Sequence, residues 1–382
     1  MLNKIINMIQ SQIYREKGSL DYHTWIFSSV DNCNFNYNSK YLFLYVREHL
    51  PQIQPLFVLN DAQKRRMLEK KYGSRYFLDG TTKDGLKKIL KAGVWFTSAG
   101  LPAYEWSGNP RRIVVNLWHG IPLKKIALLE EHASTFQKLY FKRIFSNKYS
   151  YVLTTSTHLV PVMAESLGVE KEIVKVWGQP RNDVVMRGKK KEALETLLDI
   201  EEKNAQWILY APTYRDHTAT RLFPFEDYEK EELEKFLQEK KIHICIRMHL
   251  EETLEKEKYL SKNIHFLNED VIDDIAQWMG CFDLLITDYS SIYLDYLLLD
   301  KPIIFLPYDK EEYLKDRGMN YPYDEVTPGA KPNTQQQLIL NIENSLFGED
   351  AYRTQRRECN AYFNQVTDPC CAFICQQILQ EI

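Results

Sequence analysis

Short apolar runs alternate with longer amphipathic segments along the first half of the chain. The segments 36–50, 64–72 and 82–92 have the apolar spacing of helices. Continuous apolar runs are typical of strands that are buried on both faces, so we expect a parallel sheet with helices on both sides. The runs interpreted as strands are 25–28, 54–59, 94–97, 113–117, 151–155 and 173–177.

The same alternation restarts after a highly charged stretch at 187–202. A chain of 382 residues exceeds the size at which one hydrophobic core keeps growing. We therefore expect two Rossmann-like α/β domains, at 1–200 and 201–382. The strands of the second half are expected at 207–210, 242–246, 264–267, 284–287 and 303–306, and its helices at 271–279, 292–299, 334–346 and 371–382.

The stretch 283–309 is a strand, a polar turn, a helix and a second strand. Its turn contains Thr287, Asp288, Ser290 and Ser291, at the carboxyl end of a strand, where open parallel sheets bind ligands. The two serines precede the helix, so they could cap its N–H groups, and those groups could also receive a phosphate. The alternative is a capped helix without a ligand. The turn contains no glycine, which excludes a Walker loop and a dinucleotide fingerprint.

A histidine and a glycine, His119 and Gly120, follow the run 113–117 at a predicted strand end. Gly120 permits a positive φ or a close ligand approach, and Pro122 stiffens the loop. Lys124 adds positive charge. His119 is therefore a candidate catalytic residue, with a purely structural histidine as the alternative.

Other basic residues also follow predicted strands. Arg181 lies in the polar loop 178–183, and Arg215 follows the strand at 207–210. Arg215 could bind a phosphate or pair with an acidic neighbour. Arg247 and His249 follow the strand at 242–246. The sequence thus places cations and a second histidine at strand ends of the second half.

The overall composition excludes several classes of protein. The net charge is −3, with 44% hydrophobic and 26% charged residues, which argues against a disordered chain and a generally basic nucleic-acid binder. The seven cysteines have no zinc-site or CxxC spacing, so we expect free thiols in a reducing cytoplasm. No run has the ~20 apolar residues of a membrane span, and no secretory signal is evident.

Two segments are amphipathic. Apolar residues recur at helical spacing in 1–15, and 134–149 combines an aromatic apolar face with Lys138, Lys142 and Arg143 and lacks acidic residues. Packing on the protein's own core is the commoner role of such helices. The basic and aromatic character of 134–149 supports the alternative hypothesis that this helix, together with 1–15, docks on an anionic cytoplasmic membrane surface.

Five motifs together resemble the CDP-glycerol glycerophosphotransferase family of teichoic-acid and capsule polymer synthesis. They occur in the family's order and extend over residues 25 to 330: NLWHGIPLKKI at 116–126, GQPRND at 178–183, YAPTYRD at 210–216, IRMH at 246–249 and TDYSSIYLDYLLLDKPIIF at 287–305. The sequence departs from the family pattern at Ile121, where Thr is usual, and at Leu250, where Pro is usual. The resemblance implies a GT-B fold, in which the amino-terminal domain binds the acceptor and the carboxyl-terminal domain binds the nucleotide.

The resemblance also implies a reaction. An acceptor hydroxyl attacks the β-phosphorus of CDP-glycerol or CDP-ribitol and releases CMP. His119 would be the base, and His249 would be the second catalytic histidine, holding the diphosphate with Arg247. Arg215, Thr287, Asp288, Ser290 and Ser291 would complete the donor site, and Gly120, Lys124 and Arg181 are further candidates.

The expected partners follow from the same resemblance: a lipid-linked or polymer acceptor and the inner face of the cell membrane, with no nucleic acid. Because no convincing carboxylate cluster is present, we expect no catalytic metal. We also expect no cofactor, with CDP-glycerol or CDP-ribitol as the donor substrate. Two alternatives remain, a GT-B glycosyltransferase or epimerase that acts on a nucleotide sugar, and a non-catalytic relative that only binds membrane or polymer.

Overall fold

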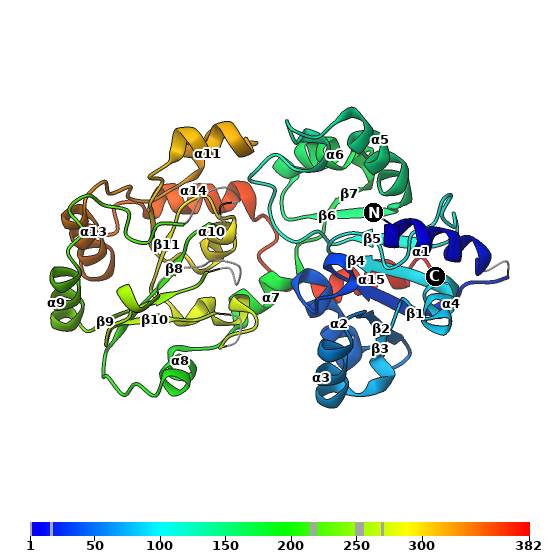
Figure 1. Cartoon of the computed structure of the whole chain (residues 1–382), viewed down its shortest axis with the longest axis horizontal. Helices are drawn as coiled ribbons and strands as arrows, with labels where there is room; N and C mark the ends of the chain where they lie inside the picture. Colours follow the sequence, from blue (N-terminus) through cyan, green and yellow to red (C-terminus); the bar gives the residue numbers. More distant parts are fainter. Residues whose placement is uncertain (1, 16–17, 214, 216–219, 249–255, 269–270) are drawn as a thin grey trace. The chain divides into compact units, whose positions relative to one another are not determined.

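The structure is a computed structural model that describes residues 2–15, 18–213, 215, 220–248, 256–268 and 271–382 (Figure 1). The chain divides into two compact units. The first comprises Met1–Asp183 and Gln365–Ile382, and the second comprises Val184–Asn364. The division thus falls before the charged stretch rather than near residue 200, and the end of the chain returns to the first unit.

The first unit contains a seven-stranded parallel sheet in the order β3-β2-β1-β4-β5-β6-β7. The strands are β1 (Asp21–Ser28), β2 (Gln54–Val58), β3 (Phe77–Leu78), β4 (Ala92–Thr97), β5 (Ile113–Asn116), β6 (Tyr151–Thr154) and β7 (Val174–Val176). The α-helices of this part of the chain are α1 (Leu2–Ile13), α2 (Tyr37–His49), α3 (Ala62–Tyr72), α4 (Lys83–Lys91), α5 (Thr135–Ile144), α6 (Val160–Leu167), α7 (Pro180–Arg187) and α15 (Cys371–Leu379). The expected strands of the first half are all present, and the two-residue β3 was not expected.

The core of the first unit lies between one sheet face and two helices that are distant in sequence. Phe27 and Phe96 stack from adjacent strands with ring centroids 5.0 Å apart. Leu42 and Phe43 of α2 and Ile374 of α15 belong to the same buried cluster. The apolar face of α15 thus completes a core that begins near the amino terminus, which explains why the end of the chain belongs to this unit.

The second unit contains a five-stranded parallel sheet in the order β10-β9-β8-β11-β12. Its strands are β8 (Gln206–Ala211), β9 (Ile242–Ile246), β10 (Ile264–Phe266), β11 (Leu284–Thr287) and β12 (Ile303–Phe305). Its α-helices are α8 (Lys191–Leu198), α9 (Lys230–Lys240), α10 (Ile292–Tyr296), α11 (Lys310–Arg317), α12 (Tyr323–Val326), α13 (Gln335–Phe347) and α14 (Arg353–Phe363). Buried residues of β8, β9 and β11 pack with α9 and α13. The expected mixed α/β architecture with two parallel sheets is therefore confirmed.

One helix prediction in the second unit is wrong. The range 271–279 was expected to be helical, but the structure has a 3₁₀ helix at Ile275–Cys281. The Asp274 carboxylate accepts a hydrogen bond from the Ala276 N–H at 3.1 Å. An aspartate that caps backbone N–H groups favours the start of a helix at that point, so Asp274 lies before the helix and not within it.

Two further expectations can be compared with the structure. All seven cysteines are free thiols, as expected. Among the described residues, no helix has the length and apolar character needed to cross a membrane.

Candidate active site

His119 lies just beyond β5, at the carboxyl edge of the first sheet, as the sequence predicted. The residue before it, Trp118, has a φ of +53°, a left-handed conformation that is uncommon for a bulky residue. The Trp118 N–H donates to the Asn116 side-chain oxygen at 2.9 Å, which supports this turn. Unfavourable backbone conformations are retained where the surroundings enforce them, and they are frequent at functional sites.

A single hydrogen bond fixes which nitrogen of His119 can act as a base. The Nδ1 atom lies 2.8 Å from the Ser98 carbonyl oxygen. A carbonyl only accepts, so Nδ1 carries the proton and Nε2 carries the free lone pair. The Ser98 hydroxyl lies 2.8 Å from the Ser39 backbone N and 2.8 Å from the Ser39 hydroxyl, which anchors Ser98 to α2. The tautomer of His119 is therefore set by the end of β4 and the start of α2.

Neighbouring rings and charges keep the imidazole neutral. Burial of the ring lowers the pKa of His119 below its ordinary value, and the Arg181 charge lowers it further, while the Ser98 hydrogen bond partly opposes both. The Tyr37 ring packs against the imidazole with centroids 5.3 Å apart. At neutral pH the histidine is consequently unprotonated on Nε2 and able to accept a proton.

Asn38 and Arg181 form a clamp around the His119 loop. The Asn38 side chain donates to the carbonyl oxygens of Leu117 at 3.0 Å and Trp118 at 2.9 Å, and accepts from the Arg181 N–H at 3.0 Å. The Arg181 guanidinium donates to the His119 carbonyl oxygen at 2.7 Å. The structure thus brings the predicted residue Arg181 to His119.

Sequence reasoning missed the role of Asn38, which lies within the segment 36–50 that was predicted only to be helical. The residue at the cap position of α2 is Asn36, without a capping side-chain hydrogen bond. Nearby, Gln179 and Asn182 from the 178–183 loop are buried. Among the described residues, the Asn182 side-chain amide has no hydrogen-bond partner. A buried amide without a partner is a candidate for binding a substrate hydroxyl.

The remaining candidates of this loop have less defined roles. Gly120 is buried and has a φ of +155°, within the region that favours glycine. Ile121 is buried, so the residue that replaces the family's usual Thr packs inside the unit. Lys124 is half-buried.

In the second unit, two polar side chains of the 287–291 turn form hydrogen bonds with residues at the end of β8. The buried Thr287 hydroxyl donates to the Ala211 carbonyl oxygen at 2.7 Å. The Asp288 carboxylate accepts from the Thr213 N–H at 2.8 Å and from the Thr213 hydroxyl at 2.6 Å. These contacts join the ends of β8 and β11, so Thr287 and Asp288 hold the turn in place, and their contact with the donor stays a prediction.

Arg215 pairs with acidic neighbours, the second of the two roles that the sequence allowed for it. It donates to Asp288 at 2.7 Å and through two nitrogens to Asp309 at 2.8 and 2.9 Å. Burial alone would lower the pKa of Arg215, but the hydrogen bonds and charges of Asp309 and Asp288 raise it above its ordinary value. Arg215 thus belongs to a buried ion-pair network that supports the turn, and its contact with the donor phosphate stays a prediction.

The two serines differ in their capping roles. The Ile292 N–H donates to the Ser290 hydroxyl at a long 3.4 Å, whereas Ser291 makes no capping side-chain hydrogen bond. The expected double cap is thus reduced to one weak contact, because α10 begins directly after Ser291 in helical backbone geometry. Both serines are half-buried.

Arg247 anchors the loop beyond β10. Its guanidinium donates to the Leu267 carbonyl oxygen at 2.8 Å and to the Ile272 carbonyl oxygen. The side chain is half-buried, at the carboxyl end of β9. His249 and Leu250 lie outside the described residues.

Two parallel sheets covered by helices place the chain in the α/β class, and comparisons with known proteins specify its family. A family profile described as CDP-Glycerol:Poly(glycerophosphate) glycerophosphotransferase matches residues 9–375. The chain belongs to this family and is a phosphotransferase.

Individual relatives agree with the family assignment. The chain is 28% identical over 337 residues to a teichoic acid poly(glycerol phosphate) polymerase of Bacillus spizizenii, which covers 83% of this chain and 82% of the relative. It is 26% identical over 340 residues to a teichoic acid glycerol-phosphate transferase of Staphylococcus aureus, covering 82% and 81%. A solved structure of the wall teichoic acid polymerase TagF has the same fold, with a TM-score of 0.80 at 22% identity, covering 100% of this chain and 96% of that one.

Proposed function

We propose that this protein transfers glycerol phosphate from CDP-glycerol to an acceptor hydroxyl and releases CMP, during synthesis of a teichoic-acid-like polymer. The observation that carries the proposal is the geometry of His119, whose Nδ1 is held by the Ser98 carbonyl and whose Nε2 is left as an acceptor. The family and the polymer-synthesising relatives support the choice of donor and product.

The proposed chemistry needs a base and groups that balance charge on the phosphates. Nε2 of His119 takes the proton of the acceptor hydroxyl as the oxygen attacks the β-phosphorus of the donor. The new oxygen–phosphorus bond forms while the bond from that phosphorus to the CMP oxygen breaks. We assign donor binding to Arg247, Ser290 and Ser291, together with His249.

We further propose a GT-B arrangement of the two units, in which the first binds the acceptor and the second binds the nucleotide. In the first unit, the Asn182 amide beside the His119 clamp is suited to an acceptor hydroxyl. In the second, Arg215 and Asp288 support the donor turn. His119 is then expected to face Arg247 and the 287–291 turn.

The identity of the leaving nucleotide tests the proposed reaction. Incubation of the purified protein with CDP-glycerol and a teichoic-acid primer should produce CMP and lengthen the acceptor by one or more glycerol phosphate units, measured by liquid chromatography with mass spectrometry. CDP-ribitol and UDP-N-acetylglucosamine serve as parallel donors. Release of a nucleoside diphosphate, or turnover of the nucleotide sugar alone, would contradict phosphotransfer and favour the glycosyltransferase or epimerase alternative.

We also propose that α1 and α5 dock the enzyme on an anionic membrane surface. Helix α1 uses polar residues to contact its own unit: the Asn7 side chain accepts from the Tyr104 N–H at 2.8 Å, and Ser11 is buried. Its isoleucines instead point outward. Ile5, Ile6, Ile9 and Ile13 expose between 44% and 68% of their surface.

Helix α5 buries one apolar side chain and exposes two others. Ile144 is buried, as expected for packing on the core, but Phe136 and Leu139 are 68% and 65% exposed. The loop between β4 and β5 contacts both helices. In this loop the Tyr104 N–H donates to Asn7 of α1, and the Tyr104 ring lies 6.0 Å from the ring of Phe145, which follows α5. Exposed apolar side chains from both helices, beside basic residues, form a surface suited to anionic lipid.

Vesicle sedimentation tests membrane docking. The wild type should sediment with vesicles of phosphatidylcholine and phosphatidylglycerol and dissociate at high salt, because lysine and arginine residues near an anionic leaflet contribute roughly 1 kcal/mol each. A variant with Lys138, Lys142 and Arg143 changed to Glu should remain in the supernatant.

A matched charge reversal controls for net charge. The variant with Arg66, Lys70 and Lys71 changed to Glu alters exposed positions on α3 by the same total charge. It should bind vesicles as the wild type does. Docking through α5 would be discarded if both triple variants bound equally, or if the wild type did not bind.

A further inference from the structure

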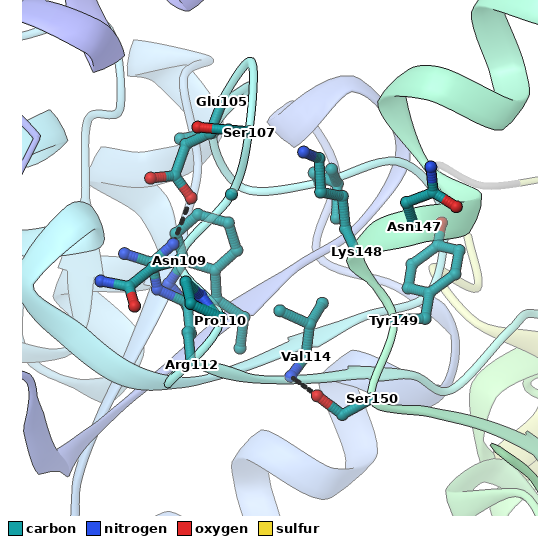
Figure 2. Close-up of a pocket in the computed structure, with 14 residues that line it drawn as sticks. Glu105, Ser107, Asn109, Pro110, Arg112, Val114, Asn147, Lys148, Tyr149 and Ser150 are labelled. Carbon is teal, nitrogen blue, oxygen red and sulfur yellow. Dashed lines mark hydrogen bonds and ion pairs between the residues drawn. The ribbon is translucent and has the colours of Figure 1, made fainter.

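A separate cavity lies in the first unit, away from the His119 edge of the sheet. Its volume is about 260 Å³. Figure 2 shows Glu105 and Arg112 on one side, Asn147, Lys148 and Tyr149 on the other, and Val114 with Ser150 at the strands. Arg112 and Ser150 directly precede β5 and β6, whereas His119 follows β5. The cavity therefore opens near the amino ends of these strands, and the proposed reaction does not use it.

A buried ion pair forms one wall of the cavity. Arg112 and Glu105 are 4% and 7% exposed and pair through Nη1 and Oε2. Arg112 also donates to the Ala92 carbonyl oxygen at 3.1 Å, and its guanidinium lies 3.9 Å from the centre of the Trp95 ring. The second carboxylate oxygen, Oε1 of Glu105, is buried and has no hydrogen-bond partner among the described residues. A ligand that donates a hydrogen bond would satisfy it.

Positive charge dominates the surroundings. The Lys148 ammonium lies opposite Glu105 and donates to the Trp106 carbonyl oxygen at 3.1 Å. Burial lowers the pKa of Lys148, Glu105 raises it, and the nearby charges of Arg143 and Arg15 lower it again. Arg15 acts in the same direction on the pKa of Arg112. Four cations thus interact around one carboxylate, so the cavity has an excess of positive charge that favours an anion.

The mouth of the cavity adjoins the proposed membrane-docking surface. Arg15, just after α1, donates to the Ser107 hydroxyl at 3.2 Å and the Gly108 carbonyl oxygen at 2.8 Å, and both residues line the cavity. Between them and α5, Trp106 is 56% exposed, with the Arg143 guanidinium 5.5 Å from its ring centre. The exposed Trp106 ring therefore offers an apolar surface to the chains of a lipid whose anionic headgroup is bound in the cavity.

We propose that this cavity binds the headgroup of a phospholipid of the phosphatidylglycerol type. The phosphate lies against the Lys148 ammonium, and a headgroup hydroxyl donates to Oε1 of Glu105. This inference rests on the membrane docking proposed above, and it adds a preference for one lipid among lipids of equal charge. Apolar chains beside a charged cavity favour a lipid over a soluble phosphate.

Two lipids of equal charge provide the test. Phosphatidylcholine vesicles receive the same fraction of either phosphatidylglycerol or phosphatidylmethanol, which has the phosphodiester but no headgroup hydroxyl. The full-length wild type should bind phosphatidylglycerol vesicles about tenfold more tightly, the change expected for one hydrogen bond to a charged group. Lys148→Met keeps the apolar stem but removes the cation that holds the phosphate in the cavity, so the headgroup hydroxyl no longer reaches Glu105 and the preference should be lost. Lys88→Met, at an exposed position on α4, is the matched control and should retain it.

The outcomes separate this inference from general docking. Equal binding of the wild type to both lipids would overturn the headgroup site while leaving electrostatic docking intact. An unchanged preference in Lys148→Met would also overturn it. Absence of binding to either lipid would refute docking and the headgroup site together. The proposed reaction would still be tested independently, by measuring CMP release in solution.

Discussion

His119→Ala should reduce turnover of CDP-glycerol by about 10²–10⁴-fold, the range that positioned general bases contribute. The variant loses the Nε2 acceptor that the Ser98 carbonyl holds in place. Its affinity for the nucleotide should stay close to that of the wild type, because the donor groups are proposed in the second unit. CMP release measures turnover, and titration calorimetry with a CDP-glycerol analogue measures binding.

The pH profile is a second readout of the same prediction. The pKa of His119 is lowered from its ordinary value of 6.5, so the neutral base persists below that pH. The value of kcat/KM should therefore remain high as the pH falls through 6.5 and decline only as the pH passes the lower pKa of the folded enzyme. His158→Ala, at an exposed position beyond β6, is the matched histidine control and should keep both turnover and profile. Near-normal turnover of His119→Ala would remove the histidine from the mechanism.

Arg215→Met should destabilise the protein by roughly 3–5 kcal/mol, the cost of removing one partner from a buried ion pair. The substitution leaves the Asp288 and Asp309 carboxylates without their shared cation. The midpoint of urea unfolding measures the effect. Arg353→Met removes an exposed arginine that lies 3.4 Å from Asp300, and as a surface pair it should change the stability by less than about 1 kcal/mol.

The same variant distinguishes the two roles considered for Arg215. If the arginine bound the donor phosphate directly, Arg215→Met would weaken nucleotide affinity while the unfolding midpoint stayed unchanged. The network found in the structure predicts loss of stability first, with any loss of affinity following from displacement of the 287–291 turn. Unchanged stability would contradict the network as the reason for this residue.

Residue patterns along the chain were sufficient to predict the two parallel sheets and all their strands except the two-residue β3. Strands and helices differ in the spacing of their apolar residues along the chain. This spacing is local, so it predicts the elements without knowledge of the packing. His119 was placed at a strand end for the same reason. The motifs also indicated the family, which the comparison over residues 9–375 confirms.

Only the tertiary structure decided how the polar groups pair. Arg215 meets Asp309 across 94 positions of sequence, and Asn38 meets Arg181 across 143. A local pattern cannot select such partners, because they are fixed by which strands are neighbours and where each strand ends.

The first and last helices also show what the sequence determines and what the tertiary structure determines. The apolar spacing of α1 and α15 predicted both helices, but it could not say which surface each would use. Helix α15 buries Ile374 and Ile378 in the first core, whereas α1 attaches through Asn7 and leaves its isoleucines exposed. An amphipathic sequence determines that a helix has an apolar face, and the space available in the folded unit determines whether that face is covered.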